Sequence, residues 1–252
     1  MKIVVIGGTG LVGANVVHAL TEQGHSAVAA APSTGVNAVT GQGLTDVLRG
    51  AAVVVDVSNS PSFDDEPAME FFTKSTSNLL AAEAEAGVGH HVALSVVGTA
   101  EMASQSGYFR AKLAQEKLIA AGPIPYSILH ATQFFEFLKA IADTATVDGT
   151  VRLTPAFIQP MAAADVAQAV AGAALGAPVN GIADIGGPEK FRLPDLIRTA
   201  LIARGDTRPV VADPAAGYWG VDIAEDTLVP GDGGTLSEIR FADWILETAA
   251  KA

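Results

Sequence analysis

IVVIGGTGLVG, at residues 3–13, is the stretch of sequence that decides the fold. Its apolar start, residues 3–6, has the pattern of a buried strand, and the chain from Leu11 to Glu22 has the apolar periodicity of a helix. A strand, a glycine-rich turn and a helix in this order are typical of the first βα unit of a dinucleotide-binding fold. A turn that only shapes the backbone is the alternative.

Three of the four glycines in this turn, at positions 7, 10 and 13, follow one another at intervals of three residues. Gly7 allows a tight turn, Gly10 lets the backbone approach a pyrophosphate, and Gly13 lets helix and strand pack closely. Backbone N–H groups at the start of the helix then bind the anion. We therefore expect these residues to contact the cofactor: Gly7, Thr9, Gly10, Leu11, Val12 and Gly13.

The rest of the first half alternates between apolar runs and helical patterns. Strands without polar alternation, separated by helices, indicate a parallel sheet covered on both faces. The predicted fold class is α/β, a Rossmann-type doubly wound parallel sheet with a small C-terminal substrate lobe. The expected strands are 27–31, 36–40, 52–57, 92–95 and 126–129, and the expected helices are 44–49, 67–86 and 108–121.

After residue 134 the elements become shorter. A segment rich in Pro, Gly and Asp, 206–235, is expected to be mostly loop. We predict one domain, 1–252, with the small lobe formed mainly by about 134–235. The expected elements of this part are strands 151–153, 158–161 and 182–185 and helices 163–176, 194–204 and 237–251.

Composition excludes several classes of function. The formal net charge of −12 disfavours nucleic acid as a partner, and the lack of cysteine excludes disulfides and thiolate catalysis. No apolar run is long enough to cross a bilayer, and Met1-Lys2 leads directly into the first strand, so we expect no signal peptide and no membrane. The expected protein is cytoplasmic, a monomer or homodimer, and acts on a small-molecule substrate.

The residues after the second strand bear on the choice of cofactor. An acidic residue there would accept the ribose 2′-hydroxyl of NAD and repel the 2′-phosphate of NADP. The sequence has AAPST at 30–34 instead, and Ser33 could donate a hydrogen bond to a phosphate. This favours NADP over NAD, although Ser33 and Thr34 are equally typical of a plain turn.

Polar residues also follow three later strands, at the carboxyl edge where ligands of such sheets bind. Asn59 and Ser60 follow one strand and are expected to contact the cofactor, with a turn before Pro61 as the alternative. Thr132 follows another, next to Gln133, and is expected near the nicotinamide. Ser95 ends a third strand.

Tyr108 and Lys112 lie four residues apart, on one face of the expected helix. A neighbouring ammonium favours tyrosinate and lowers the pKa of the phenol towards a value useful for proton transfer. The hydroxyl of Ser95, thirteen residues before Tyr108, could orient a substrate carbonyl. These three residues are the candidate catalytic group.

The glycine turn and Tyr-x-x-x-Lys after a strand-end serine together resemble the short-chain dehydrogenase/reductase superfamily. Further segments resemble its atypical, NmrA-like branch of NAD(P)H-binding proteins: HVALSVVG at 91–98, YFRAKLAQE at 108–116, ATQFFEF at 131–137, PMAAADVA at 160–167 and GGPE at 186–189.

This resemblance implies an NADP-preferring oxidoreductase that reduces a small, largely apolar carbonyl or quinone. In this interpretation Tyr108 donates the proton, Lys112 binds the nicotinamide ribose, and Ser95 binds the substrate oxygen. Some members of the branch bind NADP as regulators without turnover, so a non-catalytic sensor is the first alternative. A sugar-nucleotide epimerase-like enzyme is the second.

Other notable residues have structural explanations. His90 and His91 have no further ligand at metal spacing, so we expect no metal site. Asp165 is expected to cap a helix. The pair Tyr218-Trp219 could either close over a substrate or anchor its loop.

Overall fold

The computed structural model describes residues 1–249. The predicted final helix is present as α9, Phe241–Ala249; its expected extension to 251 lies outside the described residues. Among the described helices, none is both long and apolar enough to cross a membrane.

A seven-stranded sheet forms the centre of the fold, in the order β12-β9-β5-β4-β3-β1-β2. The pairings β1–β2, β1–β3 and β3–β4 are all parallel. Strands β2 and β3 lie on opposite sides of β1, so the strand order reverses at β1. Ligands of such sheets bind at this switch point, outside the carboxyl ends of the strands. The strands are β1 Lys2–Ile6, β2 Ser26–Ala30, β3 Val53–Asp56, β4 His90–Val96, β5 Tyr126–Ala131, β9 Gly181–Gly186 and β12 Thr235–Leu236.

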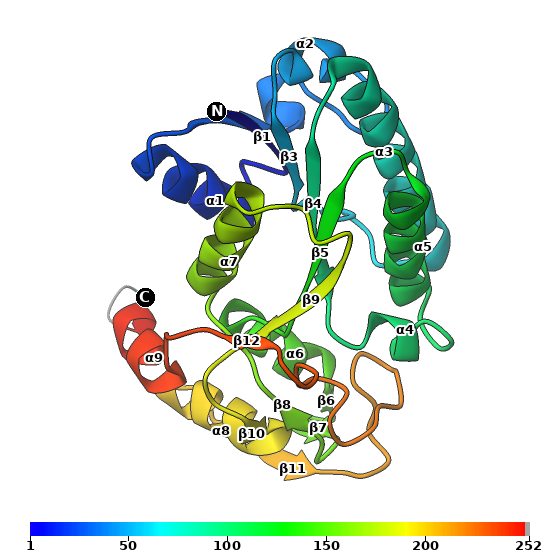
Figure 1. Cartoon of the computed structure of the whole chain (residues 1–252). Helices are drawn as coiled ribbons and strands as arrows, with labels where there is room; N and C mark the ends of the chain where they lie inside the picture. Colours follow the sequence, from blue (N-terminus) through cyan, green and yellow to red (C-terminus); the bar gives the residue numbers. More distant parts are fainter. Residues whose placement is uncertain (250–252) are drawn as a thin grey trace. The chain divides into compact units, whose positions relative to one another are not determined.

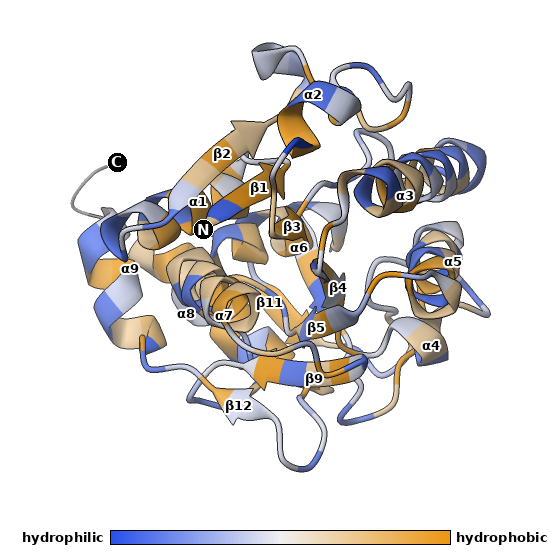
Figure 2. Cartoon of the chain, turned by 45° about the horizontal axis from the view of Figure 1, so that its top comes forward, coloured by the Kyte–Doolittle hydropathy of each residue, from blue (hydrophilic) through white to orange (hydrophobic). Residues whose placement is uncertain are grey.

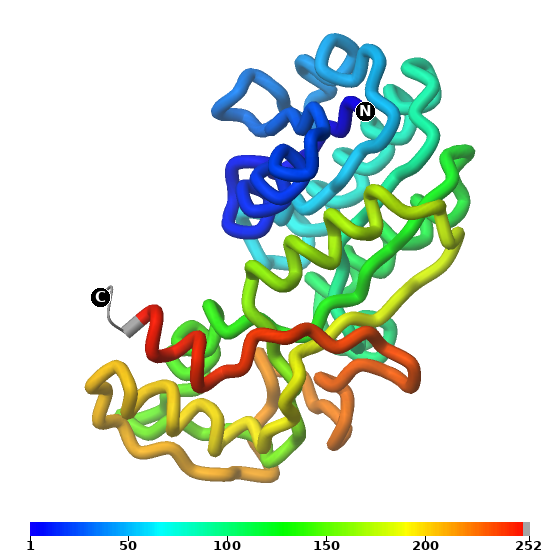
Figure 3. Tube along the Cα trace, turned by 60° about the vertical axis from the view of Figure 1, so that its left-hand side comes forward, coloured from blue at the N-terminus to red at the C-terminus, as the bar shows by residue number. Residues whose placement is uncertain are grey.

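The chain divides into two compact units. The first contains Met1–His130 and Val166–Ala183, and the second contains Ala131–Asp165 and the described chain from Asp184 onward. Figure 3 shows the chain return to the first unit as α7, which lies beside the N-terminal segment. The predicted single domain with a lobe at about 134–235 stays a prediction.

Helices cover both faces of the sheet in the first unit (Figure 1). Helices α3 and α5 lie on one face, and α1 and α7 lie on the other. Figure 2 shows the apolar character of β1 and β3 between them, and residues 3–5 of β1 are completely buried. The helices are α1 Leu11–Glu22, α2 Leu44–Leu48, α3 Asp65–Ala86, α4 Thr99–Met102, α5 Gly107–Ala121 and α7 Ala163–Leu175.

The second unit contains shorter elements. Two small sheets have the orders β10-β8 and β11-β7-β6. Its elements are η2 Phe135–Phe137, α6 Leu138–Thr144, β6 Thr146–Val147, β7 Thr150–Leu153, β8 Phe157–Ile158, β10 Phe191–Arg192, α8 Leu193–Ala203 and β11 Val210–Ala212.

Most predicted elements are present, but the strand expected at 36–40 is wrong. The side chain of Asn37 accepts hydrogen bonds from the backbone N–H groups of Val39 (2.9 Å) and Thr40, which turns the chain. Helices α4 and α6 were not predicted, nor was β11 within the expected loop. Asp165 is not a helix cap: it lies inside α7, and its carboxylate accepts from the backbone of Ile239 at 3.0 Å.

Candidate functional site

The glycine turn is built so that side chains are excluded from it. Gly7 has a φ of +77°, and a Cβ there would lie 2.9 Å from the backbone of Ser58. A Cβ on Gly13 would lie only 2.1 Å from the carbonyl oxygen of Gly7. The backbone of the glycine turn therefore lies close to the loop after β3 and to the start of α1. A backbone cradle for an anion requires this close approach.

The start of α1 offers its backbone N–H groups. Gly10 is the N-cap residue, no side chain caps the helix, and the first turn contains no acidic residue. Leu11 is exposed to 48% beside it. Uncapped N–H groups and the positive end of the helix dipole favour a bound anion here. The predicted contacts Thr9, Gly10, Leu11 and Val12 all lie on this turn.

The loop after β3 brings Asn59 to Tyr108. The phenol of Tyr108 donates a hydrogen bond of 3.1 Å to Oδ1 of Asn59, and the same oxygen accepts from the backbone N–H of Ser60. Two residues predicted independently as cofactor contact and proton donor are thus direct partners, 49 residues apart in sequence.

Tyr108 lies among aromatic rings at the start of α5. The rings of Phe63 and Phe72 are 5.0 and 5.9 Å from it. This desolvation raises the pKa of Tyr108 to about 12, while the hydrogen bond with Asn59 acts in the opposite direction. The expected lowering of this pKa by Lys112 is therefore wrong for the structure as it stands.

Lys112 is almost completely buried, with 3% of the residue exposed. Its ammonium donates to the carbonyl of Leu94 at 2.9 Å and to Oε1 of Gln115, and it lies 4.6 Å from the ring centre of Phe72. Burial lowers the pKa of Lys112 to about 8, against the attraction of Asp56 and Glu116. Its pKa thus lies well below the usual range of a lysine.

Asp56 and Gln115 are functional candidates that sequence reasoning missed. Gln115 donates through Nε2 to Oδ2 of Asp56 at 3.0 Å, and Oδ1 of Asp56 accepts from both the backbone and the hydroxyl of Ser58. Both residues are about 1% exposed. The available sequence signals were a carboxylate ending an otherwise apolar strand and an amide three residues after Lys112.

The hydroxyl of Ser95 already has a hydrogen-bond partner within the protein. Its hydroxyl donates to Oε1 of Glu116, which also accepts from Nε2 of His130 at 3.0 Å. Thr99, the other hydroxyl near this strand end, donates to the carbonyl of Val96. Binding of a substrate oxygen by Ser95 stays a prediction, and it requires the hydroxyl to exchange Glu116 for the substrate.

The residues after β2 form a closed turn, η1, Pro32–Thr34. The hydroxyl of Thr34 accepts from the backbone N–H of Ala31 at 2.9 Å and donates to its carbonyl. The side chain of Thr34 therefore stabilises a plain turn, which was the alternative to phosphate binding. Ser33, the preceding residue, is exposed. No acidic side chain occurs in this turn.

In the second unit, Thr132 and Gln133 lie at the end of β5. Thr132 is buried and donates to the carbonyl of Gln159 at 2.7 Å. Gln133 is 7% exposed, yet neither polar atom of its side chain has a hydrogen-bond partner among the described residues. An unpaired buried amide costs free energy unless a ligand or water satisfies it.

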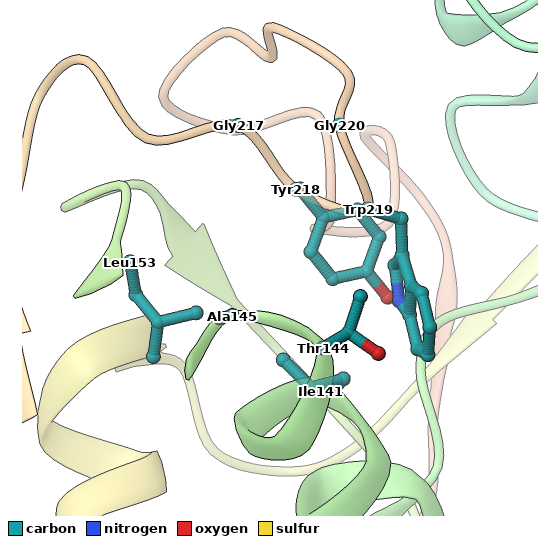
Figure 4. Close-up of a pocket in the computed structure, with 8 residues that line it drawn as sticks. All are labelled: Ile141, Thr144, Ala145, Leu153, Gly217, Tyr218, Trp219 and Gly220. Atoms are coloured by element: carbon teal, nitrogen blue, oxygen red, sulfur yellow. The ribbon is translucent and has the colours of Figure 1, made fainter. Parts of the chain in front are cut away.

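Tyr218 and Trp219 line a small pocket of the second unit (Figure 4). Tyr218 is buried, and its backbone exchanges hydrogen bonds with Val221 within the same loop. Trp219 has a positive φ of 51° and is 47% exposed. Both side chains lie with Ile141 and Thr144 of α6. The burial of Tyr218 favours the loop-anchor interpretation for this residue, which stays a prediction.

Among the described residues, no group of three possible metal ligands occurs, and His90 and His91 have other neighbours. His91 Nδ1 instead lies 2.8 Å from Glu83 Oε1, with both side chains fully buried. His90 lies 2.9 Å from the hydroxyl of Ser127.

Comparison with known proteins defines the class of fold. No family model and no curated protein matches the sequence. Solved structures do match over the whole chain, at low identity. A short-chain dehydrogenase/reductase superfamily protein from Agrobacterium tumefaciens, with bound NAD, is 18% identical at a TM-score of 0.74, covering 99% of this chain and 96% of that one.

Two further structures are similar to the same degree. UDP-glucose 4-epimerase from Thermus thermophilus, in complex with NAD, is 20% identical at a TM-score of 0.73, covering 99% and 98% of the two chains. A dTDP-4-dehydrorhamnose reductase from Clostridium acetobutylicum is 15% identical at 0.71, covering 100% and 99%. The chain therefore has the Rossmann-type fold of these proteins. The NmrA-like resemblance stays a prediction.

Proposed function

We propose that this protein is an NAD(P)-dependent oxidoreductase whose cofactor is held by the glycine turn. The observation that carries the proposal is the cradle itself: side chains are excluded at Gly7 and Gly13, and the first turn of α1 is uncapped. The solved structures with bound NAD have the same fold. When bound, the cofactor supplies hydride chemistry that side chains cannot perform.

The chain's own residues would provide orientation and a proton. The first turn of α1 would bind the pyrophosphate, and Lys112 would hold the nicotinamide ribose. Tyr108, with its phenol held by Asn59, would give its proton to the substrate oxygen. A pKa of about 12 keeps that proton in place at neutral pH.

The substrate we propose is a small, largely apolar carbonyl or quinone. The ring of Phe63 is 65% exposed and packs against Tyr108, which gives the proton donor an apolar neighbour. We propose NADP ahead of NAD because no carboxylate follows β2 to repel a 2′-phosphate.

A sugar-nucleotide substrate has less support. It needs cationic side chains for a diphosphate, and Arg152, Arg192 and Arg208 each already pair with a carboxylate at 2.6–3.5 Å. Cofactor binding without turnover is the stronger second candidate, because the Ser95 hydroxyl donates to Glu116 and the Tyr108 phenol donates to Asn59.

One experiment separates the two candidates. Purified protein is titrated with NADPH and NADH by nicotinamide fluorescence, and loss of reduced cofactor is then followed with ketones and quinones. Binding with turnover supports the oxidoreductase. Binding without turnover of any compound supports the sensor, and no binding contradicts both.

A further inference from the structure

The ammonium of Lys112 has an unusual means of compensation for its burial. A buried charge is costly unless it is paired and hydrogen-bonded. Among the described residues, the Lys112 ammonium donates hydrogen bonds to two neutral groups, the carbonyl of Leu94 and the side-chain amide of Gln115. The compensating carboxylate, Asp56, lies one hydrogen bond further away, on the other side of the amide.

The direction of this chain of hydrogen bonds is determined by chemistry. An ionised carboxylate only accepts, so Asp56 orients Nε2 of Gln115 towards itself. Oε1 of Gln115 must then face Lys112, whose ammonium only donates. Reversing the amide would set donor against donor at one end and acceptor against acceptor at the other.

Asp56 is itself fixed by the loop that supports the glycine turn. Oδ1 accepts from the backbone N–H of Ser58 at 3.0 Å and from its hydroxyl at 2.6 Å. The backbone of Ser58 is what a Cβ on Gly7 would strike. A continuous chain of contacts thus joins the glycine turn to Lys112.

We infer that Gln115, oriented by Asp56, is a positioning residue that keeps the Lys112 ammonium charged and in place for the cofactor. We call the hydrogen-bonded series Asp56–Gln115–Lys112 the bridge. The role of the ammonium in cofactor binding rests on the proposed function, whereas the bridge itself does not. The charged groups facing Lys112 are Asp56 from β3 and Glu116 from α5, with Tyr108 one turn away on α5. The ring of Phe72, on helix α3, lies beside the ammonium, and His91 of β4 interacts electrostatically with Asp56.

The decisive variant is Asp56→Asn, which keeps the shape and removes the charge. The amide introduced at position 56 can donate to Gln115, so the Gln115 amide loses its fixed direction. Its NH₂ group can then face Lys112, where donor meets donor. We expect the Lys112 titration to move down by about one pH unit or more.

The matched rescue is the double variant Asp56→Asn/Gln115→Glu. It moves the carboxylate from position 56 to position 115, where it can accept from both neighbours at once. We expect the Lys112 titration to return at least to its wild-type midpoint. A residue with a merely structural role would not be rescued by relocating a charge. Asp46→Asn is the control, because that carboxylate is 84% exposed on α2.

The titration is measured without cofactor, by NMR of the lysine side-chain nitrogens, with the Lys112 signal assigned by its loss in Lys112→Met. A downward shift in Asp56→Asn, recovery in the double variant and no change in Asp46→Asn support the bridge. An unshifted Lys112 in Asp56→Asn overturns it, and so does a double variant that stays low.

Affinity for NADPH and NADH is then measured at pH 7.5 to 8.5 on the same proteins. A one-unit fall from a pKa of about 8 reduces the charged fraction of Lys112 about threefold at pH 7.5 and about eightfold at pH 8.5. We expect Asp56→Asn to bind the cofactor more weakly by these factors and the double variant to recover. Shifted titration with unchanged affinity overturns the role of the bridge in cofactor binding. Failure of wild type to bind either cofactor overturns the proposed function, and the NMR titration still decides the bridge.

Discussion

Tyr108 combines a raised pKa with a hydroxyl that has one clear partner, Asn59. Such a group releases a proton only to an acceptor that develops negative charge, which suits a general acid rather than a base. Tyr108→Phe should therefore leave cofactor affinity unchanged and reduce turnover of the best ketone or quinone about a hundredfold or more.

The control for this variant is Tyr126→Phe, the same change at the start of β5. Its turnover should equal that of wild type. If Tyr108→Phe turns over substrate as fast as wild type, Tyr108 is not the proton donor.

Two buried glutamines of the second unit allow the free-energy cost of an unpaired side-chain amide to be measured. Among the described residues, Gln133 has no partner for either polar atom of its side chain, whereas Nε2 of Gln159 donates to the carbonyl of Gly187 at 2.7 Å. Gln133→Leu should raise the free energy of unfolding of the cofactor-free protein by about 1 kcal/mol or more, and Gln159→Leu should lower it by a similar amount. Urea unfolding of both variants measures this, and destabilisation by Gln133→Leu would show that the amide is satisfied.

At the scale of single elements, the first βα unit was predictable because its cause is local. Strand, turn and helix follow one another within residues 2–22. A side chain is excluded at Gly7 by the loop after β3 and at Gly13 by the turn itself. The strand expected at 36–40 failed for a local reason too, since Asn37 turns the chain before a strand can extend.

The bridge from Asp56 to Gln115 could not be predicted in this way. Its two residues are 59 positions apart, and only the packing of α5 on the sheet brings them together. The same holds for Ser95, whose position was predicted but whose partner Glu116 depends on the rotation of α5 about its axis. Sequence spacing identifies residues of one helix face, but not what that face meets.

The glycine turn yields a matched pair of predictions. Gly13→Ala places a methyl 2.1 Å from the carbonyl of Gly7, so the turn must open. We expect a loss of about 3 kcal/mol or more of stability, with loss of cofactor binding in whatever protein remains folded. Gly172→Ala, where a Cβ meets nothing within 4 Å in the interior of α7, should instead stabilise by about 0.5–1 kcal/mol. Equal thermal stability of the two variants would contradict this account of the turn.

Helix α3 and strand β4 are joined by the buried pair Glu83–His91. Burial alone would lower the pKa of His91, but the charge and hydrogen bond of Glu83 outweigh it, so the pKa is raised above 6.5. The protonated form is thus favoured by folding, and its contribution is complete below pH 6.5 and lost as the pH rises through the raised value.

His91→Gln should therefore destabilise the protein most at low pH, and its difference from wild type should shrink at alkaline pH. Urea unfolding of both proteins from pH 5.5 to 9 measures this difference in the free energy of unfolding. Contributions from the titration of other groups are the same in both proteins and cancel in the difference. His18→Gln, in an exposed pair with Glu22, is the control and should show a small difference at every pH. A difference for His91→Gln that grows with pH would refute the assignment.

At the scale of the whole molecule, the fold is that of solved structures at 15–20% identity, two of which contain NAD. Such likeness establishes architecture, and function depends on the site. The acidic surface, with a net charge of −12, does not oppose an anionic cofactor, because backbone N–H groups rather than basic side chains form the cradle.

The central claim is that this cradle binds a nicotinamide dinucleotide. The most direct test is equilibrium titration of the wild-type chain with NADPH and with NADH, followed by nicotinamide fluorescence. We predict saturable binding of at least one, tighter for NADPH, with an increase in thermal stability at saturation. A folded protein that binds neither and gains no stability from either would contradict the account.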